Sequence, residues 1–339
     1  MKVILVIALL IQVSLSLEIP DADDKLHIYA LPLVGGCTVI QCPKGEEDGA
    51  KGAVTIIDTG KSSSNSIGGK DVKRFLSGTT IKHIFLTNSN KNSRKYFKDI
   101  LNSFKQYIPV HHPCSWKSYD TGSKYAQPKE IQQCSSISEC DYEIELCPGV
   151  TISVVAAGLG ECKGRDDGAN NIDSLIAKMT YTGADTYGYG TYVTALFSGN
   201  FEASGSVVSR LIEKAGEDLS ADIYRLSNEG NYPLANSRTL LNAIKARYVF
   251  TSSEHKKSLP RCEIYDYYKT NDNIDHVERH PYTCYDANKK LTNIDPEVAL
   301  YGTNVYQPDE KKYKKVFFVL DFSINSSGDI GVKMTNAKN

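Results

Sequence analysis

Two histidines at short spacing mark the first place in this chain where metal chemistry could arise. His276 and His280, in "HVERHP", have the i, i+4 spacing that places two imidazoles on one face of a helix. Val277 stands where a helical zinc motif of this kind carries its glutamate, and Pro281 favours a loop over a helix. We therefore do not expect this pair to hold a metal ion.

Other catalytic groupings are equally weak. His111 and His112 are adjacent at the end of a strand, so their side chains point to opposite faces. Ser204 lies in "ASGSVVS", which lacks the G-x-S-x-G spacing of a nucleophile elbow, and no phosphate-binding G-x-x-x-x-G-K-[ST] occurs. The residues themselves indicate no nucleophilic or nucleotide-hydrolysing site.

An unusual polar cluster follows the short apolar run Ile84 to Leu86. The segment "TNSNKNS", residues 87–93, has asparagines at alternating positions and ends in Ser93. It stands where a strand should turn into an amphipathic helix, with Ser93 as a candidate N-cap. Taken locally, the segment is a polar turn.

The cysteine pattern predicts disulfides. The chain has nine cysteines, and no C-x2-C pair of the kind found in zinc ribbons. We expect Cys114, Cys134, Cys140 and Cys147 to pair among themselves, in one of three possible arrangements, and Cys262 to pair with Cys284. The odd number leaves one thiol free or joined to another chain.

The N-terminus predicts export from the cytosol. Residues 1–16 carry one lysine, an apolar run and small residues before a cleavage point, as in a secretory signal peptide. No window is long enough to span a membrane. Asn325, in Asn-Ser-Ser, is a candidate N-glycosylation site. The formal net charge of -1 argues against a basic nucleic-acid-binding face. We expect a secreted protein.

Hydrophobic periodicity alternates between strands and helices along the first half. Three short β-rich runs within residues 25–60 predict an antiparallel opening, followed by a helix near residues 69–76 and a buried strand at 81–87. A second helix is expected from 93 to 107 and a strand at 107–112. Residues 113–148 are rich in Cys, Ser and Lys, which predicts a disulfide-tied insertion on the surface.

The second half repeats the order, with strands first and helices after. Strands are expected near 150–158, 173–183 and 190–200, and then two strand–helix alternations between 205 and 253. The end of the chain reads as a closing hairpin. Burial of this pattern is simplest in one α/β domain over residues 17–339, an αβ/βα four-layer sandwich of two sheets flanked by helices.

An ordered series of short motifs resembles the metallo-β-lactamase fold superfamily, in the branch found as the hydrolase domain of competence-type, ComEC-like DNA-uptake proteins. The series covers about residues 26–268. It consists of "TIIDTG" (55–60), "IFLTNSNKNS" (84–93), "NNIDSLIAKMTYTG" (170–183), "ALFSGN" (195–200), "ADIYRLSNEGN" (221–231), "LLNAIKARYVFTSS" (240–253) and "LPRCEIYDYY" (259–268).

Against this resemblance, the metal-binding motifs are degenerate. The family's T-H-x-H-x-D-H reads T-N-S-N-K-N-S here, its T-G-D reads S-G-N, and its later H-H-G-S reads N-E-G-N. The former ligand positions are Asn88, Asn90, Asn92, Ser93, Asn200 and Asn228. Asp58, at the end of its strand, is retained and is expected to have a structural role near the metal site.

Chemistry then predicts the loss of zinc. A catalytic zinc needs about three nitrogen, thiolate or carboxylate ligands, and neutral amide oxygens are poor substitutes. Calcium accepts amide oxygens but normally adds several carboxylates, and Glu229 is the only acid inside the replaced motifs. We expect no cofactor and a secreted pseudoenzyme with a binding, structural or regulatory role, whose extracellular partner or small ligand the sequence does not name.

Two alternatives remain open. The chain could be a secreted phosphodiesterase or nuclease-like hydrolase with a relocated or metal-free site, for example Glu229 with His255 in the old cleft. It could instead bind a small ligand such as a sugar or nucleotide in the amide-lined cleft, because amides both donate and accept hydrogen bonds.

Overall fold

A computed structural model describes residues 17–45, 49–63, 67–119, 122–162, 171–184, 190–252, 254–308 and 313–337. The expected signal peptide, residues 1–16, lies outside them. Among these residues no helix is both long and apolar enough to cross a membrane.

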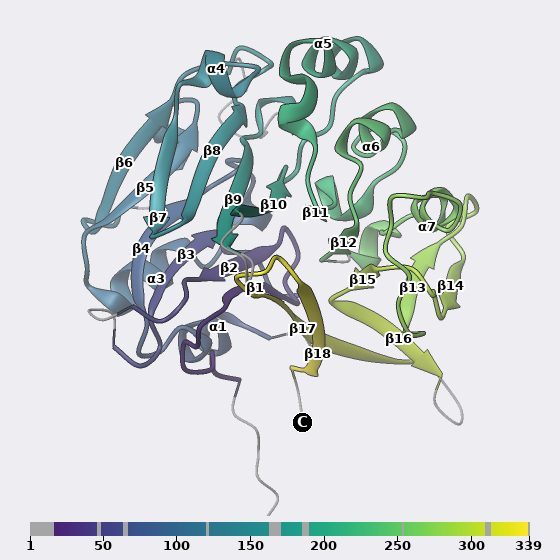
Figure 1. Ribbon diagram of the computed structural model, residues 1–339, viewed down its shortest axis with the longest axis horizontal. Coiled ribbons are helices and arrows are strands. Elements are labelled where there is room, and N and C mark those ends of the chain that lie inside the picture. The colour runs from purple at the N-terminus through teal and green to yellow at the C-terminus, as the bar shows by residue number, and fades with distance from the viewer. Residues whose placement is uncertain are drawn as a thin grey trace, which may run out of the picture.

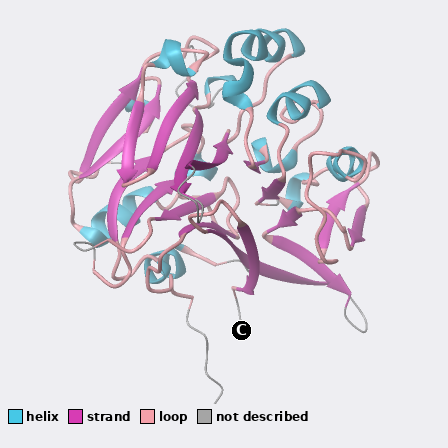
Figure 2. Ribbon diagram, viewed as in Figure 1, coloured by secondary structure: helices cyan, strands magenta, loops and turns pink. Residues whose placement is uncertain are grey.

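Two mixed sheets packed face to face form the centre of the fold (Figure 2). In the described residues the first sheet runs β16-β17-β1-β2-β3-β4-β5-β6, with β18 paired to β17. Its strands are β1 (Leu26–Leu31), β2 (Cys37–Gln41), β3 (Ala53–Ile57), β4 (Thr80–Phe85), β5 (Ile108–Pro113), β6 (Ala126–Ile131), β16 (Asn304–Pro308), β17 (Tyr313–Ile324) and β18 (Ile330–Asn336).

The second sheet runs β15-β12-β11-β10-β9-β8-β7, and a separate hairpin pairs β13 with β14. These strands are β7 (Glu143–Cys147), β8 (Val150–Ala156), β9 (Ile176–Ala184), β10 (Gly190–Phe197), β11 (Ile223–Arg225), β12 (Tyr248–Thr251), β13 (Tyr282–Tyr285), β14 (Leu291–Ile294) and β15 (Leu300–Gly302).

Helices cover the outer faces of both sheets. Figure 1 shows α5 and α6 side by side above the second sheet and α1 and α3 below the first. The helices are α1 (Gly69–Phe75), α2 (Lys91–Arg94), α3 (Phe97–Phe104), α4 (Ile137–Cys140), α5 (Gly205–Ala215), α6 (Arg238–Ile244) and α7 (Cys262–Tyr268). Single 3-10 turns occur at η1 (Trp116–Ser118), η2 (Asn171–Asp173), η3 (Gly216–Leu219), η4 (Ser227–Gly230) and η5 (His255–Lys257).

Strand alternation explains the layers. Along β1, Ile28 faces the core between the sheets, whereas Tyr29 faces the core shared with α1 and α3. On the other side, α5 and α6 direct Leu211 and Leu241 toward the second sheet. Both faces of the central strands are therefore buried, and the arrangement is the αβ/βα four-layer sandwich predicted from the sequence.

The segment after β4 differs from the expected single helix. It forms the short α2 and then α3, and Asn90 caps α2 by accepting a hydrogen bond from the Asn92 backbone N–H. Ser93 is not the N-cap. It is buried inside α2, and its backbone carbonyl accepts from the Thr59 and Gly60 N–H groups. At the start of α6, Ser237 is the N-cap and accepts a hydrogen bond from the Leu240 N–H.

Residues 113–148 contribute a strand to each of the two sheets. This stretch provides β6 at one edge of the first sheet and β7 at one edge of the second, so the chain crosses between the sheets here. Its low apolar content fits edge strands, whose outer faces meet solvent. Figure 1 shows β6 and β7 along the same side of the molecule.

The crossing changes the disulfide pairing. Cys134 pairs with Cys140 inside the stretch, but Cys114 pairs with Cys162 and Cys147 with Cys42, so mutual pairing of the four cysteines is wrong. The ends of the stretch lie beside different segments, which provide the outside partners. Cys262 pairs with Cys284, as expected. Cys37 is the free cysteine and is buried.

Candidate functional site

A buried ion pair joins the two sheets at the edge where the polar turns meet. Asp58 follows β3 with a left-handed φ of 57°, and its carboxylate accepts hydrogen bonds from the Thr87 backbone N–H and hydroxyl. Arg225, the last residue of β11, donates from Nη1 to Asp58 Oδ2 at 3.0 Å. Both charged side chains are at most 3% exposed. The pair thus holds the first sheet to the second.

The same arginine extends the network to Glu229. Arg225 Nη2 donates to the Gly35 carbonyl at 2.8 Å, and the Gly35 N–H donates to Glu229 Oε1 at 2.5 Å. Gly35 has a φ of 74°, and a Cβ there would collide with the backbone of Asn92. Only glycine fits this close approach. Gly35 therefore connects the 87–93 turn, Arg225 and Glu229.

The asparagines of the 87–93 turn bond to the chain around them. Asn88 Oδ1 accepts from the Asn90 N–H at 2.8 Å, and Asn90 Oδ1 accepts from the Asn92 N–H at 3.0 Å. Each is an Asx turn in which the side chain caps the backbone two residues on. Asn88 Nδ2 donates to Ser174 Oγ at 3.0 Å. The turn is therefore closed by its own amides and by the segment before β9.

The other former ligand positions lie at the same edge. Asn200 follows β10, and its Nδ2 donates to Ser93 Oγ at 3.0 Å. Gly199 packs directly against Thr87, where a Cβ would clash. The Asn228 backbone N–H donates to the Gly199 carbonyl at 2.9 Å. The segments 87–93, 198–200 and 228–231, far apart in sequence, thus meet in space.

One carboxylate accepts hydrogen bonds from three asparagine side chains at this cluster. Glu202 accepts from Asn228 Nδ2 at 2.6 Å, from Asn171 Nδ2 at 3.1 Å and from Asn231 Nδ2 at 3.3 Å. We call Asn88, Ser93, Asn200, Asn228 and Glu202, with their partners, the amide network. Its donors are directed at protein oxygens.

The amide network does not fit a zinc site. Zinc binds imidazole nitrogen, thiolate or carboxylate, and the former ligand positions provide only amides and a hydroxyl. Amide nitrogens of Asn88, Asn200 and Asn228 carry the hydrogens that they donate, so they offer no lone pair. The buried Asn200 Oδ1 has no partner in the described residues, but one neutral oxygen does not make a zinc site.

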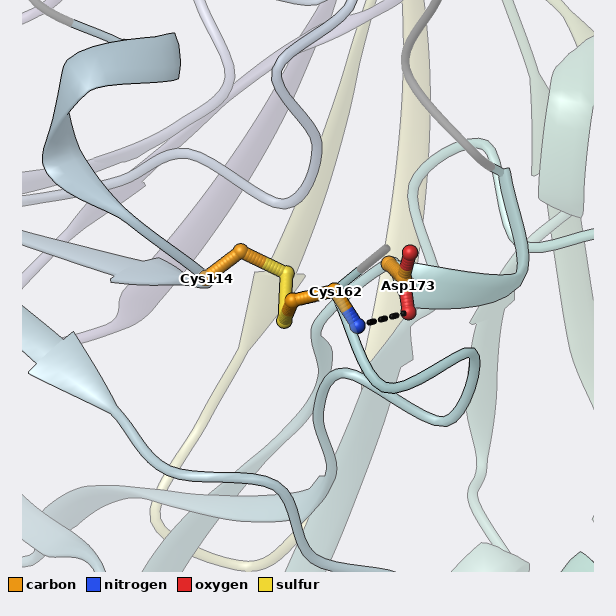
Figure 3. A group of neighbouring side chains, drawn as sticks. All are labelled: Cys114, Cys162 and Asp173. Carbon is orange, nitrogen blue, oxygen red and sulfur yellow. Dashed lines mark hydrogen bonds between the residues drawn. A yellow bond between two sulfur atoms is a disulfide. The ribbon is translucent and has the colours of Figure 1, made fainter. Parts of the chain in front are cut away.

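One other cluster has the composition of a metal site. Cys114, Cys162 and Asp173 converge from three segments, and they are the one such group found in the described residues (Figure 3). The two cysteines form a disulfide, so neither sulfur is a thiolate ligand. Asp173 accepts from the backbone N–H groups of Gly160 and Cys162. These contacts make the cluster a disulfide-stabilised loop.

Glu229 occupies an electrostatically costly position. It is buried, and desolvation together with the nearby charge of Glu254 raises the pKa of Glu229 to about 7. The Gly35 N–H, Arg225 and Lys257 oppose this shift. Asn228 and Glu229 both have left-handed backbones, with φ of 44° and 50°. Two adjacent non-glycine residues in this region store strain of the kind found at functional sites.

Glu229 and His255 do not form the pair considered from the sequence. No hydrogen bond or ion pair joins them in the described residues; Glu229 bonds to Gly35, and His255 Nδ1 bonds to the Tyr285 hydroxyl at 3.1 Å. Burial lowers the pKa of His255 to about 3, with a contribution from Lys315, so the imidazole is neutral at physiological pH.

His255 instead belongs to a neighbouring pocket of about 200 Å³. Val34 and Lys61, which bridge the β1–β2 and β3–α1 connections, line one side. Glu254 and His255 line the other, and Tyr306 packs edge-on against the His255 ring. None of the former ligand asparagines lines it. The pocket lies beside the amide network, not in it.

The remaining histidines have structural surroundings. His111 packs against Phe85 and bonds to Tyr142, whereas His112 packs against Trp116 on the other face. His276 lies in a loop, bridged to Val298, and His280 Nε2 bonds to the Leu300 carbonyl. The two members of each pair therefore have different neighbours.

Three residues that contact or influence this region were not predicted from the sequence. Arg225 ends an apolar strand, and a lone arginine in "ADIYRLS" is the signal for a buried partner. Glu202 lies two residues beyond the S-G-N motif, outside the motif boundary. Glu254 precedes His255 but becomes relevant only because the fold places it near Glu229.

Comparisons with known proteins give distant likeness. No family model matches the chain, and neither does any curated protein. A long-form RNase Z from yeast is similar at 13% identity and a TM-score of 0.41, over 75% of this chain and 40% of that chain. The metallo-β-lactamase MIM-1 from Novosphingobium pentaromativorans is similar at 11% identity and a TM-score of 0.33, over 66% of this chain and 85% of that chain. This chain thus spans less than half the length of the RNase Z.

Proposed function

We propose that this chain is a secreted protein of metallo-β-lactamase type that has exchanged its zinc ligands for the amide network and works by binding, without metal-dependent hydrolysis. The ordered motif series, which resembles ComEC-like hydrolase domains, supports this assignment. The four-layer architecture fits it, and four disulfides fit an oxidising compartment.

One observation carries the proposal. At three separate former ligand positions, the side-chain nitrogen donates a hydrogen bond to another residue of the chain: Asn88 to Ser174, Asn200 to Ser93, and Asn228 to Glu202. These bonds hold together the turns that a metal ion would otherwise bridge. Hydrolysis in this fold depends on a metal that lowers the pKa of bound water, and the amide network offers no substitute for that effect.

The deciding experiment is metal analysis of the mature chain, residues 17–339, purified from a secretory host without added chelator. We expect substoichiometric zinc, and a thermal midpoint that neither chelator nor added zinc changes. About two bound zinc equivalents, or phosphodiesterase turnover that a chelator abolishes, would refute the proposal.

Asn325 fits the secreted context as a glycosylation site. It lies in the turn between β17 and β18, where its Oδ1 accepts from the Asp329 N–H. Mass spectrometry of the secreted chain before and after glycosidase treatment tests this part. An unmodified Asn325 peptide from a eukaryotic secretory host would contradict it.

A further inference from the structure

The pocket beside the amide network is surrounded by lysines from three distant segments. Lys61 follows β3, Lys256 lies in η5 after β12, and Lys315 lies on β17. Tyr306 is directly opposite Lys315 in the β16–β17 register, so both side chains are on one face. Polar side chains in the pocket lining include Lys61, Ser62, Ser63, Lys256, Tyr306 and Lys315.

The positive charge of this pocket is uncompensated. The acid in its lining, Glu254, already pairs with Lys257, with 3.1 Å between Nζ and Oε2. Among the residues that the structure describes, no ion pair reaches Lys61, Lys256 or Lys315. Lys315 is half-buried and donates to Ser63 Oγ at 3.2 Å. Burial, with the nearby charge of Lys256, lowers the pKa of Lys315 to about 8.

We propose that this pocket binds a small tetrahedral oxyanion, the phosphate group of a phosphate monoester, between Lys61, Lys256 and Lys315. Lysine ammonium groups act as point charges on phosphate oxygens. Three of them favour a phosphate monoester, which carries nearly two negative charges at pH 7, over a singly charged carboxylate. The pocket lining includes three lysines, two serines and a tyrosine but no arginine. Hydroxyls of this kind complete the coordination of phosphate oxygens.

The inference names the ligand class for the proposed binding function, and it rests on that function. The zinc analysis tests the amide network and the phosphate titration tests the pocket, so either proposal can be refuted without the other. None of the lining residues belongs to the amide network.

Isothermal titration calorimetry on the mature chain tests the proposal with inorganic phosphate, glycerol phosphate, sulfate and acetate. We expect one site that binds both phosphates more tightly than acetate. Lys315→Gln is expected to weaken phosphate binding at least about tenfold, because it removes the half-buried charge-assisted contact. Lys256→Gln, at an exposed position, is expected to weaken it as well.

Lys314→Gln is the matched control. Lys314 neighbours Lys315 on β17 but points to the opposite face of the strand, and its removal changes the net charge equally. We expect phosphate affinity within about twofold of the wild type for this variant. Equal losses in Lys314→Gln and Lys315→Gln, or acetate binding as tightly as phosphate, would overturn the proposal. Circular dichroism of each variant verifies the fold.

Discussion

At the positions that the resemblance predicts as former ligands, the asparagine amides bond to the surrounding chain. An amide both donates and accepts, so Asn88 can cap Asn90 with its oxygen and reach Ser174 with its nitrogen. Bonds of this kind satisfy buried polar atoms without a cation. At this edge Asp58 and Arg225 form a buried ion pair, whereas Glu229 is in no ion pair within the described part of the chain.

Glu229 makes a pH-dependent contribution to stability. Its pKa is about 7 in the folded chain, against an ordinary value of 4.5. Between these values the folded state keeps a proton that the unfolded chain releases, so the free energy of unfolding falls as pH rises. Below pH 4.5 both states are protonated, and above pH 7 the loss is constant.

We therefore expect Glu229→Gln to remove this decline, which amounts to roughly 3 kcal/mol at most. The glutamine oxygen can still accept from the Gly35 N–H, so the contact survives. Urea unfolding of both proteins between pH 4 and 8 measures the difference, and other titrating groups cancel in the comparison. Parallel stability curves would contradict a raised pKa for Glu229.

At the scale of elements, the crossing from β6 to β7 links the two sheets. Cys42 follows β2 of the first sheet, and Cys147 ends β7 of the second, so their disulfide joins the sheets covalently. The Cys134–Cys140 bond closes a short loop around α4. The two bonds differ in the sequence separation they close, 105 residues against 6.

Loop closure predicts unequal effects for these disulfides. Replacing Cys42 and Cys147 by alanine should lower the free energy of unfolding by about 5 kcal/mol, and replacing Cys134 and Cys140 by about 2 kcal/mol. Both double variants lose one bond and leave no new thiol, so each serves as the control for the other. Denaturant unfolding measures both. If removal of the Cys134–Cys140 bond lowered the free energy of unfolding more than removal of the Cys42–Cys147 bond, chain entropy would not be the main source of disulfide stabilisation.

At the scale of the whole molecule, the two ends of the described chain lie in one sheet. β17 pairs antiparallel with β1, and β18 pairs with β17. From β17, Phe322 crosses the core to reach Phe250 of β12 and Tyr301 of β15, with ring centroids 5.2 and 6.0 Å apart. The last long strand therefore completes the core between the sheets.

Phe322→Ala should destabilise the entire fold by about 3–5 kcal/mol, because it opens a cavity between the sheets. Phe322→Leu keeps most of the buried volume and is expected to cost less. Thermal unfolding, followed separately by circular dichroism and tyrosine fluorescence, measures both variants. If only one of the two probes reported a lower unfolding temperature, the closing hairpin would be unfolding separately from the rest of the chain.

Much of the architecture was predictable from local pattern. The strand and helix order, the Ser237 cap and the sandwich follow from periodicity and turn residues, which depend on neighbours within a few positions. The series of replaced motifs also predicted which polar turns belong together. The error at Ser93 arose because two capping residues, Asn90 and Ser93, compete within one turn.

The sequence by itself determined which residue types, amides and a hydroxyl, stand at the positions that the resemblance predicts as former ligands, because residue type does not depend on the fold. Tertiary structure alone decided what each amide bonds to, because Asn200 and Ser93 lie 107 positions apart. It likewise decided that Arg225 faces Asp58, that Cys42 reaches Cys147, and that three lysines surround one pocket. Local pattern fixes the type of each element, whereas long-range partners depend on how strands are ordered in the sheets.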